Sequence, residues 1–121
     1  MATGLSVARA NAAIDSTVAL GSWIKLHVGD PGAAGTANPA GNTTRQQATF
    51  GAAANGSATT TAVTEWTNVP TAEDYTHFSM WTASTAGTFL ASGTIVANPV
   101  AVGDTFRFAA GSLTLSVTPA S

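Results

Sequence analysis

The sequence predicts an all-β fold, namely a β-sandwich or a flattened barrel of about seven to eight short antiparallel strands with a short N-terminal helix. Two observations predict the strands. Apolar side chains alternate with a period of two after residue 22, and turn residues recur at short intervals up to the end of the chain. The 121 residues suit one hydrophobic core. We therefore predict a single domain over residues 1–121, with a helical appendage over 3–20 and a sandwich over 22–118.

The stretch before residue 21 is rich in alanine and has no proline and no glycine after Gly4, which favours a helix. Thr3 or Ser6 is expected to cap its N-terminus, and Gly21 ends it. Its apolar rows are narrow, so we expect it to pack as an appendage on a sheet. Leu5, Ala8 and Ala12 form one row, and Ile14 and Val18 form the second.

Alternating patterns locate the individual strands. In the first strand, Ile24, Leu26 and Val28 share one face. Asn55-Gly56 is a residue pair that two-residue hairpin turns prefer, so the strands on either side of it are expected to pair. The expected strands span residues 23–28, 43–54, 57–66, 75–82 and 88–95, and Phe50 points inward from the second of them.

The strand over residues 75–82 is predicted to lie in the centre of its sheet, because it carries bulky side chains on both faces. The next strand follows a turn at Thr85-Ala86-Gly87 and is expected to stop at Asn98-Pro99, since proline has no amide hydrogen to donate to a ladder. In the central strand, Phe78 and Met80 share one face, and Tyr75, His77, Ser79 and Trp81 share the other.

The last predicted element is a hairpin with a turn at Ala110-Gly111. Apolar side chains alternate on both of its strands, so we expect both strands to face the core. Phe106 and Phe108 lie on the first strand, and Leu113, Leu115 and Val117 lie on the second.

Charged residues are rare, with four basic and six acidic side chains in the whole chain. Neutralising even a handful of phosphates would take every Lys and Arg, so binding to nucleic acid or to an anionic membrane is not expected. So little charge gives a soluble monomer little colloidal repulsion, which indicates a surface covered by neighbouring subunits. The first twenty residues contain no continuous apolar run of signal-peptide or membrane length, so no export signal is expected.

No residue pattern points to catalysis, a metal or a cofactor. His27 and His77 are the only histidines, and neither has a carboxylate nearby in the sequence, so both are interpreted as hydrogen-bonding strand residues. Glu73 and Asp74 are adjacent and would point apart on a strand, so they are expected to cap or solubilise the turn before Tyr75. The chain has no cysteine and no nucleophile elbow around a serine.

The longest predicted loop spans residues 29–42, whose four glycines, two prolines and two asparagines prevent a ladder. Within it, Asp30-Pro31-Gly32 is a strand-ending turn. A calcium site on Asp30, Asn38 and Asn42 is the weaker hypothesis, because no spaced acidic series enforces the coordination. We expect the loop to dock against a neighbour. The candidate docking residues are Gly29, Asp30, Pro31, Gly32, Thr36, Asn38, Pro39 and Asn42.

A series of motifs extends over almost the whole chain. After the Ala-rich helix come Leu26-His27-Val28-Gly29-Asp30-Pro31-Gly32 and Ala33-Ala34-Gly35-Thr36, then Arg45-Gln46 before Phe50, Asn68-Val69-Pro70, Thr76-His77 before Trp81, and Gly103-Asp104. This order resembles small tail-fibre-type, minor tail or capsid decoration proteins of actinobacterial phages. Ser79, Met80 and Thr82 depart from the pattern, which has a glycine before an aliphatic residue and an acidic residue after the tryptophan. These departures leave the predicted fold unchanged and blur the subtype.

The resemblance implies a non-enzymatic structural component of a bacteriophage virion, made in the bacterial host cytoplasm and displayed on the virion surface. By analogy with such parts, we expect a homotrimer that docks to major capsid or tail proteins of the same phage. The lack of collagen-like or coiled-coil repeats favours decoration of the head over a tail position. The alternative function is a carbohydrate-binding module that attaches the particle to host cell-wall glycans. The candidate interface or glycan-stacking aromatics are Trp23, Trp66, Tyr75 and Trp81.

Overall fold

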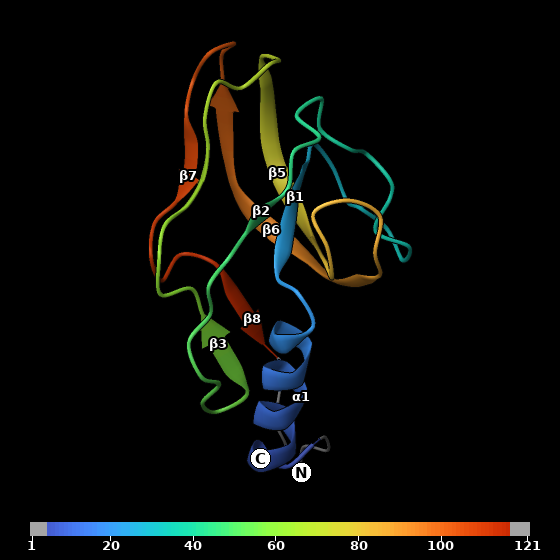
Figure 1. Ribbon diagram of the computed structural model, residues 1–121, viewed down its shortest axis with the longest axis vertical. Helices are drawn as coiled ribbons and strands as arrows, with labels where there is room; N and C mark the ends of the chain where they lie inside the picture. Colours follow the sequence, from blue (N-terminus) through green and yellow to red (C-terminus); the bar gives the residue numbers. More distant parts are fainter. Residues whose placement is uncertain (1–4, 117–121) are drawn as a thin grey trace.

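The computed structural model describes residues 5–116, apart from the side chains of residues 96–98. This part of the chain holds one helix and eight strands, and every strand pair is antiparallel, which confirms the all-β fold with a short N-terminal helix. Figure 1 shows the helix at one end of the molecule. The elements are α1 (Val7–Ala19), β1 (Trp23–His27), β2 (Gln46–Gln47), β3 (Ser57–Thr59), β4 (Thr64–Trp66), β5 (Glu73–Trp81), β6 (Phe89–Val100), β7 (Phe106–Phe108) and β8 (Thr114–Ser116).

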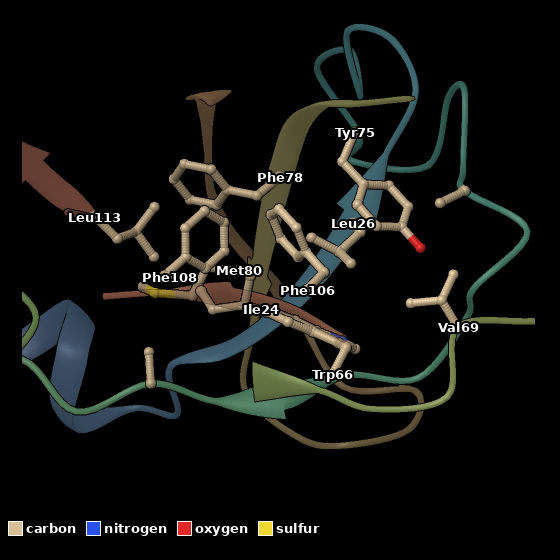
Figure 2. Close-up of a cluster of buried hydrophobic side chains, with 12 residues drawn as sticks. Ile24, Leu26, Trp66, Val69, Tyr75, Phe78, Met80, Phe106, Phe108 and Leu113 are labelled. Atoms are coloured by element: carbon tan, nitrogen blue, oxygen red, sulfur yellow. The ribbon is translucent and has the colours of Figure 1, made fainter. Parts of the chain in front are cut away.

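The strands form two layers around the core. One layer is a four-stranded sheet in the order β2-β1-β5-β6, and the other consists of the pairs β3-β8 and β4-β7. Figure 2 shows side chains of both layers meeting, with Ile24, Leu26 and Phe78 from the first layer and Trp66 and Phe106 from the second. The strands within residues 5–116 form no closed barrel, so the sandwich is the form present.

The helix begins after Ser6, whose Oγ accepts a hydrogen bond from the Arg9 backbone N–H at 3.3 Å. The other predicted cap, Thr3, lies outside the described residues. The predicted apolar rows are partly wrong, because the buried face consists of Ala10 and Ile14, whereas Leu5 is 45% exposed. This face packs on the second layer as an appendage, and the helix contacts β3.

Two local predictions are confirmed. Asn55 and Gly56 both have positive φ, and Ala54 and Ser57 exchange backbone hydrogen bonds of 2.8 and 3.0 Å across them, as in a two-residue hairpin turn. The strand β5 lies between β1 and β6. One face assignment is wrong: a register shift between Tyr75 and His77 turns Tyr75 into the core.

The predicted last hairpin is wrong in its pairing. β7 pairs with β4, and β8 pairs with β3, so both strands run alongside the single segment of residues 57–66 in the same direction. The turn at Ala110-Gly111 exists, but Gly111 N–H donates to the Thr60 carbonyl at 2.6 Å, and the chain continues instead of reversing. The burial of Phe106, Phe108 and Leu113 was predicted correctly, and Val117 lies outside the described residues.

Two strand boundaries also differ from the prediction. Of residues 43–54, only β2 pairs as a strand. In contrast, β6 continues through Asn98-Pro99 to Val100. Proline is tolerated there because β6 is an edge strand, whose outer side needs no amide hydrogen.

The two edges of the sandwich differ. On one side β2 lies beside β4, and the Trp66 indole N–H donates to the Thr44 carbonyl at 2.8 Å across the layers; we call this the closed seam. On the other side β6 and β7 are not paired with each other within residues 5–116, and a groove of about 490 Å³ lies between them; we call this the open seam.

Candidate docking surface

The predicted docking loop lies next to the turn between β5 and β6. We call residues 28–45 and 82–88 together the loop cluster, and Figure 1 shows both segments on the same side of the molecule. Arg45 joins them, because its Nη1 donates to the carbonyls of Ala83 at 2.9 Å and Ala86 at 2.7 Å. The surface is therefore built from two segments that the sequence keeps far apart.

The first part of the loop has the predicted Asp-Pro-Gly turn. The Asp30 carboxylate accepts a hydrogen bond from the Gly32 backbone N–H at 2.8 Å, and Gly32 has φ +77°. The Asn38 side-chain amide donates to the Asp30 carbonyl at 2.9 Å. Aspartate and asparagine thus shape the loop locally, and these contacts use two of the three residues of the calcium hypothesis.

His27 anchors the middle of the loop to the sheet. Its Nδ1 lies 2.9 Å from the Ala37 carbonyl, which can only accept, so Nδ1 carries the proton. Nε2 then accepts from the Ser79 hydroxyl at 2.7 Å, and Ser79 Oγ accepts from the Trp81 indole N–H at 2.7 Å. His27 is fully buried, and this desolvation lowers the pKa of its imidazole.

Glu73 anchors the end of the loop. Its two carboxylate oxygens accept from the backbone N–H groups of Gly41 at 2.8 Å and Asn42 at 3.1 Å. Glu73 therefore does cap a turn, but one about thirty residues away in sequence rather than the turn before Tyr75. Burial raises the pKa of the neighbouring Tyr75 phenol.

Aromatic packing fixes the outer part of the loop cluster. The Arg45 guanidinium lies 4.4 Å from the centroid of the Trp81 ring, and the Trp81 and Phe89 rings are 5.5 Å apart. Gly35 is buried with φ +74°, and a Cβ there would lie 2.3 Å from Phe89 Cδ1. Only glycine lets the loop approach this ring so closely.

The predicted docking residues fall into two groups. Asp30, Gly32, Thr36, Asn38 and Pro39 are exposed, whereas Pro31 and Asn42 are buried and Gly29 is intermediate. The exposed stretch around them, residues 32–39, carries no charge. The loop cluster therefore presents a preorganised surface whose stretch over residues 32–39 is uncharged.

The four candidate aromatics do not come together on one surface. Trp66 is 1% exposed and Tyr75 is fully buried, and both pack against Phe106 in the core. Trp81 is 8% exposed below Arg45, and only Trp23 is partly exposed. Stacking on a sugar needs an open ring face, which Trp66 and Tyr75 do not offer.

The sequence analysis assigned no structural role to Ser79 or Arg45, and it predicted that Glu73 caps the turn before Tyr75 instead of the end of the loop. Their partners lie 31 to 52 positions away, so no local signal could have identified them. Within residues 5–116, no group of three His, Asp or Glu side chains is placed to hold a metal ion. The described helix is too short to cross a membrane.

Comparison with known protein families finds a match over almost the whole chain. The family model described as Podophage GP4 fiber I protein gp80 matches residues 6–116, a range that includes the helix, all eight strands and the loop cluster. No curated protein matches the chain.

Proposed function

Because the chain belongs to the family of podophage GP4 fiber I protein gp80, we propose that it is displayed on the virion surface and works by self-association and by docking to other virion proteins. The family itself makes the chain a fibre-type structural protein of a bacteriophage. A structural family favours a non-enzymatic role. The single domain over residues 1–121, the homotrimer and the actinobacterial host remain predictions.

The family match over residues 6–116 carries this proposal. It also favours a tail fibre, whereas the sequence alone favoured decoration of the head. Cryo-electron microscopy of the intact particle tests the position. Density for this chain in fibres at one vertex supports the proposal, and density spread over the icosahedral shell would favour capsid decoration.

The loop cluster is the proposed docking surface. Its hydrogen bonds from His27, Glu73 and Arg45 hold the backbone in place, so little conformational entropy is lost when a partner binds. Its exposed residues 32–39 are small and uncharged, and an uncharged centre is typical of a protein–protein contact. We expect this surface to contact a major virion protein.

Ala34→Lys tests the docking surface. Ala34 is exposed in the loop, so the variant should fold normally, but a desolvated lysine should prevent its incorporation into particles. Incorporation is measured by mass spectrometry of purified virions that carry the variant. Ala8→Lys, at an exposed site of α1 outside the loop cluster, is the matched control and should be incorporated normally. Normal incorporation of Ala34→Lys would exclude the loop as the docking surface.

A further inference from the structure

The open seam leaves two strand edges without a partner among residues 5–116. In this described part of the chain, β6 pairs with β5 alone and β7 pairs with β4 alone. Backbone N–H and C=O groups along such edges can bind a further strand. Figure 1 shows that β6 runs toward the end of the molecule where β7 begins, so the two strands run in opposite directions.

The sequence of β6 does little to block this edge. Soluble proteins usually protect long edge strands with charged side chains, prolines or bulges. None of the twelve residues of β6 is charged. Pro99 lies near its end, and residues 91–94 pair regularly with β5 between two register shifts. The regular, uncharged stretch ends at Thr94, which lines the groove together with Ile95.

The groove has an apolar floor and a polar rim. Ile95 from β6 and the buried Phe106 and Phe108 from β7 line the floor, while Thr94 and Arg107 lie on the two opposite sides. Of the groove-lining residues that the structure describes, Arg107 alone is charged. This combination suits burial against an uncharged polypeptide surface.

We propose that the open seam is the contact between copies of this chain, with β6 of one copy lying antiparallel beside β7 of the next. The inference rests on the self-association in the proposed function and names its surface. A second copy is a suitable occupant because the chain has only ten charged side chains, four basic and six acidic, so two copies with a net charge of −2 each repel one another little. It also offers the complementary edge.

The expected trimer agrees with this contact. A closed ring of three copies needs a heterologous contact, in which two different surfaces of the protomer meet. β6 and β7 are two such surfaces on either side of one groove. Rotation about an axis along the strands leaves strand directions unchanged, so β6 of one copy is antiparallel to β7 of the next. The three grooves then face a common axis.

The test measures the oligomeric state of the full chain by light scattering after size exclusion, over a range of concentrations. We expect the wild-type chain to be trimeric. Thr94→Lys places a cation beside Arg107 of the next copy and should raise the dissociation constant at least about tenfold. Thr94 is exposed in the single copy, so the Thr94→Lys variant should have the same circular dichroism spectrum as the wild-type chain.

Two further variants complete the test. Thr67→Lys adds the same charge at the closed seam and should leave the trimer intact. Arg107→Glu combined with Thr94→Lys places opposite charges across the contact and should recover most of the association.

Three results would overturn the inference. If Thr94→Lys stays trimeric at all concentrations, self-association stands but its contact lies elsewhere. If the wild-type chain is monomeric and its Thr94→Lys variant is missing from virions, a different virion protein occupies the groove. If the wild-type chain is monomeric and Thr94→Lys enters virions normally, both the self-association and the groove contact fail.

Discussion

The two seams of the sandwich close in different ways. At the closed seam, the chain provides its own contacts: β2 lies beside β4, and Trp66 donates a hydrogen bond to the Thr44 carbonyl. At the open seam, β6 and β7 flank a groove of about 490 Å³ and share no ladder. Residues 5–116 thus complete one side of the sandwich and, among themselves, leave the strand edges on the other side unpaired.

The difference shows where this molecule keeps its capacity for association. Polar side chains of the same chain hold the backbone of the loop cluster, as Asp30 does with Gly32 inside the loop and Glu73 of β5 does with Gly41 and Asn42. The open seam instead leaves backbone groups of β6 without a ladder partner within residues 5–116. A preformed loop surface suits docking to a different protein, and a free edge suits pairing with another strand.

The largest expected effect is a loss of stability, which tests whether the core is packed where it borders the open seam. Phe108 lines the groove but is only 7% exposed, and its ring centroid lies 5.1 Å from that of Phe106. Phe108→Ala should lower the free energy of unfolding by about 3 to 5 kcal/mol, because it removes a buried ring and leaves a cavity. The midpoint of chemical denaturation measures this loss.

Val102→Ala is the control for Phe108→Ala. Val102 is 68% exposed, so its truncation should change the free energy of unfolding by less than about 0.5 kcal/mol. An unchanged midpoint for Phe108→Ala would show that the ring is not part of the core.

The next effect concerns the packing of the loop cluster. Gly35→Ala should cost about 2 to 4 kcal/mol, because it combines positive φ with a Cβ that meets the Phe89 ring. Gly111→Ala is a matched control: its φ is +85°, but nothing lies within 4 Å of the added Cβ, so only about 1 kcal/mol of backbone strain is expected. Thermal unfolding compares the two, and equal losses would contradict the contact with Phe89.

A smaller effect is the pH dependence of the anchor at His27. Burial lowers the pKa of the His27 imidazole in the folded chain below the unfolded value of 6.5. On acidification below about pH 6.5, the unfolded chain therefore takes up a proton at His27 before the folded chain does. The free energy of unfolding should therefore fall on acidification, by at most about 1.4 kcal/mol per pH unit from this group. Denaturation between pH 7.5 and 5.5 measures the slope. His27→Gln should flatten it, and a slope that persists in this variant would assign it to another group.

The sequence predicted those features of the fold that depend on neighbours along the chain. Alternation with a period of two identified Ile24, Leu26, Phe106 and Phe108 as buried, because successive side chains of a strand point to opposite faces. It could not predict that β7 and β8 both pair with residues 57–66, because the choice of partner strand is a long-range property. The register shift that turns Tyr75 into the core is also decided by the partner strand.

The same division applies to the candidate site. The turn at Asp30-Pro31-Gly32 was predictable because its hydrogen bond spans two residues. The contact of Ser79 with His27 and that of Glu73 with Gly41 were not predictable, because the two residues of each pair lie about thirty to fifty positions apart. The open edge of β6 could not be predicted from the sequence, since only the strand order shows that no fifth strand from the described residues covers it.

The smallest expected effect separates the stability of the fold from association at the open seam. Arg107 Nε lies 3.8 Å from Glu65 Oε2, with side chains 63% and 39% exposed, so solvent screens most of this attraction. Arg107→Ala should therefore change the free energy of unfolding of the separated copy by less than about 0.5 kcal/mol, as measured by denaturation at low protein concentration. A loss well above 1 kcal/mol would mean that β7 depends on this ion pair. The Arg107→Glu variant would then report on folding as well as on the contact between copies.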